Sequence, residues 1–248
     1  MSSQNDVVDL HGESLSWPEI ERRFGIYGTE LTDDDRFKKA MNLIEGPEYL
    51  DIGSDIGLAC RFQSINHHDW HITGVDILAM PVRVAEKFRP MDNVTYQVRD
   101  FQKDRFHANQ FDCISALEVI EHINDAGMFV ADIAHILKPS GCVVISTPNA
   151  VSLQNILRHI GQNIKNRLMM VASEQTNTGT NFDHVASFDV FTLTRLLHRC
   201  GLEYECHDYA KMTVPFSRSV WVRVPFLAKI VPFFADTIII KARKTKQN

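Results

Sequence analysis

The sequence predicts a doubly wound α/β fold, a mostly parallel β-sheet with helices on both faces. From residue 46 onward, short runs of β-forming residues alternate with stretches of helical periodicity, and this alternation is typical of parallel strands joined by crossover helices. A glycine-rich turn follows the first of these runs, as in nucleotide-binding α/β domains. The 248 residues are enough for one such domain with a small appendage.

Helical segments are predicted ahead of the sheet. Residues Trp17–Tyr27 are expected to form a short helix. A second helix is expected to start at Thr32, because a capping residue and the three aspartates after it suit a helix N-terminus. Apolar residues then recur at helical spacing, at Phe37, Met41 and Ile44. We therefore assign residues 1–45 to an N-terminal helical cap and residues 46–248 to the main domain.

The main domain is predicted to contain seven strands. They are Glu48–Ile52, His71–Val75, Val94–Arg99, Phe111–Ala116, Cys142–Thr147, Leu202–Asp208 and Thr237–Ala242. The helices expected between them include Met80–Phe88, Met128–Leu137, which is closed by Lys138–Gly141, and Phe188–Arg199. The polar stretch Ser152–Thr180 is helical or irregular, and residues 211–235 form an insertion between the last two strands.

Composition favours a globular protein of a reducing compartment. Hydrophobic residues make up 44% and charged residues 23% of the chain, which is close to the average for globular domains. Five scattered cysteines without a CxxC pair argue against a disulfide framework or a cysteine zinc site. The polar N-terminus does not resemble a signal peptide, and no apolar run reaches about 18 residues. We therefore expect a cytoplasmic protein.

Charge is distributed unevenly along the chain. The net charge is −5, but the segment from Lys211 to the end carries eight basic residues and only one acid, Asp236. This asymmetry predicts an anionic partner for the C-terminal part. A general nucleic-acid-binding protein is usually basic overall, so we disfavour nucleic acid as the partner.

The glycine-rich turn and a later aspartate form a candidate nucleotide site. The first strand runs into Asp51-Ile-Gly-Ser-Asp-Ile-Gly57, and glycines in such a turn let the backbone approach a ligand closely. Asp76 ends the second strand 19 residues beyond Gly57, where a carboxylate can accept hydrogen bonds from both hydroxyls of a ribose. A tight turn with a surface aspartate would give the same pattern.

Two features distinguish this turn from that of a dehydrogenase. The GxGxxG fingerprint that cradles a pyrophosphate is absent. Asp51 lies two residues before Gly53, where its carboxylate would repel a phosphate and attract a cationic amino-acid group.

At these residues the sequence resembles the class I S-adenosylmethionine (SAM)-dependent methyltransferases. Their first motif, acid-x-Gly-x-Gly-x-Gly, is matched by Asp51, Gly53 and Gly57, whereas Asp55 replaces the middle glycine. The resemblance implies a seven-stranded Rossmann-like sheet whose last strand is antiparallel, and SAM as the cofactor. It also implies a cofactor site formed by Asp51, Gly53, Ser54, Gly57, Asp76, Ile77, Asp100, Phe101 and Glu118.

A second cluster of functional residues follows the fourth strand. Glu118, Glu121 and His122 are spaced so that one helical turn places them on one side, which makes a partial site for a hard divalent cation or a general base. His184 is a fourth candidate. The pattern resembles ubiquinone-biosynthesis O-methyltransferases and small-RNA 3′-end 2′-O-methyltransferases. That resemblance implies a divalent metal such as Mg²⁺ at Glu118, Glu121, His122 and His184. Alternatively, His184 caps the following helix and Glu118 serves the cofactor.

These residues suggest a role in O-methylation. We hypothesise that Glu121, His122 and His184 bind or deprotonate the acceptor hydroxyl, because methyl transfer requires an aligned, deprotonated nucleophile. Residues 214–234 interleave aromatic and aliphatic side chains with cations. They form either the wall of the acceptor pocket or dimer surface, or a segment that contacts anionic lipid at the inner face of a membrane.

The sequence therefore predicts a SAM-dependent methyltransferase acting on a hydroxyl of a small or lipid-linked acceptor. One alternative is a 2′-O-methyltransferase of RNA ends, which the acidic bulk of the chain disfavours. The other is a catalytically silent SAM-binding protein, suggested by Asp55 in place of glycine.

Overall fold

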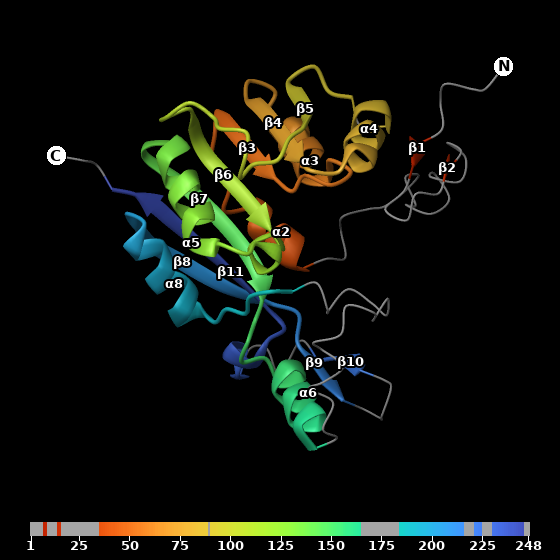
Figure 1. Cartoon of the computed structure of the whole chain (residues 1–248), viewed down its shortest axis with the longest axis vertical. Helices are drawn as coiled ribbons and strands as arrows, with labels where there is room; N and C mark the ends of the chain where they lie inside the picture. Colours follow the sequence, from red (N-terminus) through yellow and green to blue (C-terminus); the bar gives the residue numbers. More distant parts are fainter. Residues whose placement is uncertain are drawn as a thin grey trace.

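The computed structural model describes residues 7–8, 14–15, 35–88, 90–164, 184–215, 221–224 and 230–245. Seven strands form one sheet in the order β5-β4-β3-β6-β7-β11-β8 (Figure 1). They are β3 (Glu48–Ile52), β4 (His71–Asp76), β5 (Val94–Val98), β6 (Phe111–Leu117), β7 (Leu137–Pro148), β8 (Leu202–Ala210) and β11 (Thr237–Lys244). Only β11 runs antiparallel to its neighbours, β7 and β8. The predicted sheet with an antiparallel last strand is confirmed.

The largest boundary error of the sequence prediction is at β7. This strand begins at Leu137, so Lys138–Gly141 belongs to the strand and does not close the preceding helix as predicted. Leu137 pairs with Phe111 of β6, and the register shifts before Cys142 pairs with Cys113. The ladder with β6 therefore extends β7 through a Pro-Ser-Gly stretch that, from local sequence alone, favours a turn.

Helices cover both faces of the sheet (Figure 1). One apolar cluster joins the sheet to α2 (Asp35–Met41), α3 (Leu58–Asn66) and α4 (Ala79–Phe88). A second cluster joins the opposite face to α5 (Ala126–Ile136) and α8 (Val190–Arg199), where Phe129, Ile133 and Leu193 are almost completely buried. The helix predicted over Phe188–Arg199 begins at Val190, because Asp189 caps it by accepting a hydrogen bond from the Thr192 amide.

Further elements lie beyond the carboxyl end of β7 (Figure 1). They are α6 (Leu153–Ile164), the antiparallel pair β9 (Thr213–Pro215) and β10 (Trp221–Arg223), and the short helix η3 (Pro232–Phe234). The buried side chain of Asn149, just after β7, holds η3, because its amide group donates to the carbonyl oxygens of Phe233 and Ala235, both at 2.8 Å. The insertion predicted at 211–235 therefore contains two short strands where it is described.

Several predicted segments lie outside the described residues. They include the helix expected over Trp17–Tyr27 and the part of Ser152–Thr180 beyond Ile164. Near the N-terminus the structure describes only the short strands β1 (Val7–Val8) and β2 (Ser14–Leu15), which pair with each other. Among the described helices, none has both the length and the apolar character needed to cross a bilayer.

The helix α2 is attached to the far edge of the sheet by charged side chains. Lys39 donates to the carbonyl oxygen of Tyr209 in β8 at 2.6 Å. Just after the helix, Glu45 pairs with Arg243 of β11 at 2.9 Å and with the buried Lys241. The guanidinium of Arg243 lowers the pKa of Glu45 to about 2. These contacts fix α2 against the sheet and thereby position Arg36.

The strand order reverses at the centre of the sheet. From β3 the chain moves outward through β4 and β5, and then returns to β6 on the other side of β3. Ligands of open α/β sheets bind at the carboxyl ends of the strands at such a switch point. Because Ile52 of β3 is paired with Ala116 of β6, the glycine-rich turn and the Glu118–His122 segment leave the sheet side by side.

Candidate functional site

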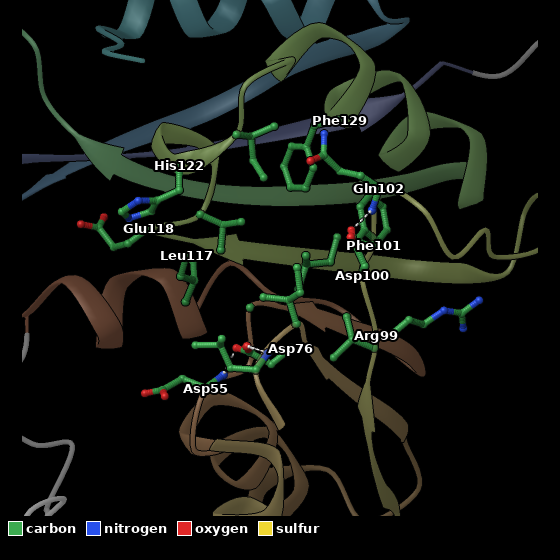
Figure 2. Close-up of a pocket in the computed structure, with 17 residues that line it drawn as sticks. Asp55, Asp76, Arg99, Asp100, Phe101, Gln102, Leu117, Glu118, His122 and Phe129 are labelled. Carbon is green, nitrogen blue, oxygen red and sulfur yellow. Dashed lines mark hydrogen bonds between the residues drawn. The ribbon is translucent and has the colours of Figure 1, made fainter. Parts of the chain in front are cut away.

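A cavity of about 430 Å³ opens at the carboxyl ends of β3, β4, β5 and β6. Its lining includes seven residues that the sequence singled out: Gly53, Asp76, Ile77, Asp100, Phe101, Glu118 and His122. Figure 2 shows Glu118 and His122 together on one side, Asp55 and Asp76 on another, and Asp100 with Phe101 on a third. Residues from both sequence clusters therefore border one cavity.

The glycine-rich turn is held tightly against β4. The amides of Gly53 and Ser54 both donate to the carbonyl oxygen of Val75, at 2.8 and 2.9 Å. Gly53 has a φ of 71°, and a Cβ atom there would lie 2.5 Å from the Val119 side chain. Glycine is therefore required by both the backbone angle and the contact with the segment after β6.

Asp55 is accommodated at the position where the class I methyltransferase motif has its middle glycine. Its φ is 46°, in the left-handed region, which aspartate adopts more readily than most residues. Its amide donates to Oδ2 of Asp76 at 3.0 Å. The replacement therefore leaves the turn closed against the next strand.

Asp76 is fixed by two backbone amides at the edge of the cavity. Oδ2 accepts from Asp55, and Oδ1 accepts from the amide of Leu78 at 2.9 Å. Each carboxylate oxygen has a second acceptor site, so both oxygens are able to accept further hydrogen bonds from a ligand. Ile77, the next residue, is 62% exposed and presents apolar surface to the cavity.

Asp100 and Phe101 lie on the β5 side of the cavity. Asp100 forms an ion pair with Lys103 at 2.7 Å, and this contact lowers the pKa of its carboxyl group. Phe101 packs edge-on against Phe129 of α5, with ring centroids 5.4 Å apart. The aromatic contact fixes a flat apolar surface in the lining of the cavity, to which Ile77 also contributes.

Asp51 lies beneath the turn and is almost completely buried. Its carboxylate accepts hydrogen bonds from Ser115 and Cys60. Burial raises the pKa of Asp51 to about 6, although these hydrogen bonds oppose the shift. Asp51 also borders a smaller hollow of about 110 Å³ that Gly53, Asp55 and Leu117 share with the main cavity.

Glu118 is held by partners from two other elements. Its φ is 58°, and Oε1 accepts from the hydroxyl of Ser146 at 3.0 Å. Oε2 pairs with the guanidinium of Arg36 at 3.0 Å. Arg36 was not predicted as a site residue, because only the packing of α2 brings it to Glu118. The sole local signal was its place in the helix predicted after Thr32.

Glu121, His122 and His184 form a second group beside the cavity. One potential ligand atom from each lies within 4.8 Å of those of the other two. The imidazole rings have centroids 4.8 Å apart. The amides of Val185 and Ala186 donate to the carbonyl oxygen of Glu121, at 2.8 and 3.2 Å. This backbone pairing explains why His184, 62 residues away in sequence, lies next to His122.

Glu121 is the buried member of this group, with 1% of its surface exposed. Oε2 accepts from the Thr147 hydroxyl at 3.1 Å, whereas Oε1 has no hydrogen-bond partner among the described residues. Burial raises the pKa of Glu121 to about 7, and the charge of Glu118 contributes to the increase. A buried oxygen without a partner is costly, so this oxygen is suited to a proton or a ligand.

Comparison with known families identifies the domain. A sequence model described as a methyltransferase domain matches residues 30–207. The chain belongs to this family. Membership confirms the resemblance to SAM-dependent methyltransferases and supports SAM as the cofactor of this methyltransferase.

A curated relative carries a more specific name. The methyltransferase is 29% identical over 116 residues to a ubiquinone biosynthesis O-methyltransferase of Rhodopseudomonas palustris. The match covers 46% of this chain and 45% of the relative. The chain thus spans less than half the length of this curated relative.

Solved structures share the fold of this methyltransferase at low sequence identity. A Haloferax volcanii methyltransferase in complex with the Trm112 activator is 18% identical, with a TM-score of 0.62 over 84% of this chain and 88% of that one. The Burkholderia thailandensis 1,6-didemethyltoxoflavin-N1-methyltransferase, solved with S-adenosylhomocysteine, is 16% identical, with a TM-score of 0.54 over 87% of this chain and 80% of that one. Both likenesses confirm the Rossmann-like fold.

Proposed function

We propose that this methyltransferase transfers the methyl group of SAM to a hydroxyl oxygen of a small or lipid-linked acceptor. The observation that carries the proposal is the convergence of Glu121, His122 and His184 beside the cavity. Two imidazoles and a carboxylate of raised pKa suit the removal of a proton from a hydroxyl. The distant O-methyltransferase relative supports the same acceptor atom.

The cavity has groups suited to each part of the cofactor. Asp76 would accept hydrogen bonds from the ribose hydroxyls, and Ile77 and Phe101 would enclose the adenine near Asp100. The glycine-rich turn and Arg36 would hold the methionyl end, because Arg36 lines the adjoining hollow with the buried Ser54. The hydroxyl of Ser54 has no partner among the described residues, so a polar ligand atom there would satisfy it.

The protein's task in this reaction is orientation and proton removal. When bound, SAM supplies a methyl group on a sulfonium sulfur that is open to in-line attack by a nucleophile. A hydroxyl is a poor nucleophile until it loses its proton. His122 lines the cavity, and the imidazole of His184 contacts that of His122. We therefore assign both histidines to the binding and deprotonation of the acceptor. Glu121 would orient the imidazoles or hold the proton at Oε1.

We also propose a divalent cation such as Mg²⁺ at this group. Two imidazoles and a buried carboxylate oxygen, which has no hydrogen-bond partner among the described residues, lie within 4.8 Å of one another, and such a donor set is able to hold a divalent cation. Glu118, included in the sequence prediction, is not part of this group and instead contacts Arg36 and Ser146. A cation here would lower the pKa of a bound hydroxyl.

Metal removal tests the cation. Treatment with EDTA should lower methyl transfer at least about tenfold without weakening SAM binding, and added Mg²⁺ should restore it. Full activity in EDTA, confirmed by elemental analysis of the treated protein, would show that the histidines act without a metal.

The O-methyltransferase assignment is tested by following a labelled methyl group. The protein, with [methyl-³H]SAM, should label the oxygen of phenolic acceptors such as catechol or a polyprenylated catechol. An aromatic amine and an RNA 3′ end serve as comparison acceptors and should remain unlabelled. Label on the amine or the RNA alone, or none on any hydroxyl while SAM binds, would contradict the proposal.

A lipid-linked acceptor would require contact with a membrane surface. In support, Val222, Ile230 and Phe233 are each more than 40% exposed in a segment whose sequence is basic. The same assay with the polyprenylated acceptor in vesicles tests this: transfer should be faster with anionic than with neutral vesicles. Equal rates of methyl transfer with both kinds of vesicle would contradict a lipid-linked acceptor and favour a small-molecule acceptor.

A further inference from the structure

The smaller hollow next to the main cavity is bordered by charges of both signs. Arg36 supplies a cation, and Asp51 and Asp55 supply carboxyl groups, around a volume of about 110 Å³. Gly53, Asp55 and Leu117 line both hollows, so one ligand can extend from one into the other. A ligand end that carries both an ammonium and a carboxylate is complementary to such a site.

The buried side chain of Ser54 also indicates a ligand in this hollow. Ser54 is 5% exposed and lines the hollow, and its hydroxyl has no hydrogen-bond partner among the described residues. Buried hydroxyls in proteins nearly always have a partner. A polar ligand group would provide one.

The two aspartates of the hollow differ in their surroundings. The Asp51 carboxylate is buried and accepts hydrogen bonds from Ser115 and Cys60. Asp55 is exposed, and its carboxylate points away from that of Asp76 (Figure 2). The amide of Asp55 is bonded to Asp76, which fixes the backbone from which this carboxylate extends.

We propose that the carboxylate of Asp55 binds the α-ammonium of the cofactor's methionyl end, while Arg36 binds its α-carboxylate. The guanidinium has five donors, so Arg36 can keep its contact with Glu118 and still bind the ligand. Glycine at position 55 would supply no charge. The replacement is therefore a gain in cofactor recognition, which depends on the SAM site described above.

Two variants and four ligands test Asp55. Asp55→Asn removes the charge and Asp55→Gly restores the family residue, which tolerates the φ of 46°. Dissociation constants are measured by calorimetry with SAM, S-adenosylhomocysteine, decarboxylated SAM and 5′-methylthioadenosine. Both variants should bind the first three about five- to tenfold more weakly. Methylthioadenosine, which lacks the amino-acid end, should bind unchanged.

An Arg36→Gln variant provides the matched comparison. It should weaken binding of SAM but not of decarboxylated SAM, because only SAM has the carboxylate. Added salt should reduce the difference between wild type and Asp55→Asn for SAM, as expected for an exposed ion pair.

Three results would overturn the inference. Unchanged SAM affinity in Asp55→Asn would show that the carboxylate does not bind the cofactor. An equal loss of affinity for methylthioadenosine would indicate that the substitution changes the conformation of the glycine-rich turn. A larger loss of affinity for SAM than for S-adenosylhomocysteine would mean that Asp55 interacts with the sulfonium charge and not with the α-ammonium. If the wild-type chain bound none of the four ligands, the proposed function itself would fail.

Discussion

Replacing His122 or His184 by alanine should lower kcat for methyl transfer at least about 100-fold. The two rings lie 4.8 Å apart, centroid to centroid, beside Glu121. We expect each to contribute to binding and deprotonating the acceptor, so the loss of either would leave the hydroxyl protonated. Affinity for SAM should change little, because the cofactor contacts assigned above come from other residues. The measurements are steady-state methyl transfer and SAM calorimetry on the same preparations.

Two controls keep this result interpretable. His68 is exposed on the loop after α3, and His68→Ala should retain wild-type turnover. Added imidazole should partly restore His122→Ala if the lost group is a base. Turnover above about one tenth of wild type in both variants would contradict the assigned roles.

Asp76→Asn should weaken SAM binding about 100-fold or more. A carboxylate that accepts two ribose hydroxyls contributes two hydrogen bonds to a charged group, each about 1.5–3 kcal/mol. Asparagine keeps the shape but replaces one acceptor oxygen with a donor. The amide of either Asp55 or Leu78, which donate to Oδ2 and Oδ1, would also lose its partner.

The choice of ligand separates the ribose contact from other effects. 5′-Methylthioadenosine has the same ribose, so its affinity should fall as much as that of SAM in Asp76→Asn. Asp69→Asn, at an exposed site on the loop before β4, is the matched control and should bind normally. A loss of affinity smaller than about fivefold in Asp76→Asn would show that Asp76 does not bind the ribose hydroxyls.

The strands were predictable because their signals are local. Glu48–Ile52 was predicted with the bounds of β3, and the other strands differ mainly at their ends. A strand is indicated by a hydrophobic run bounded by glycine or proline, and this signal lies within about five to ten consecutive residues. Leu137–Gly141 was the exception, since pairing with β6 overrode the turn-forming residues.

The residues assigned to the cofactor were also predictable from the sequence. Parallel strands end at the same edge of the sheet, so residues just after β3, β4, β5 and β6 meet wherever the strand order reverses. For this reason Gly53, Asp76, Phe101 and Glu118 all line one cavity.

Other features of the site depend on contacts between segments distant in sequence. Arg36 reaches Glu118 because α2 is fixed across β8 and β11. His184 reaches His122 because its neighbours pair with the backbone of Glu121. Local sequence reports which residues favour a helix or strand, but it does not report which partners lie across the fold.

The sheet, the glycine-rich turn and the acids and histidines near the strand ends were all predictable from local sequence. The tertiary structure decided their chemistry. It buries Glu121 and leaves one of its oxygens without a partner among the described residues, and it pairs Glu118 with Arg36. Burial raises the pKa of Glu121, and both the burial and the ion pair depend on which side chains the packed fold brings together.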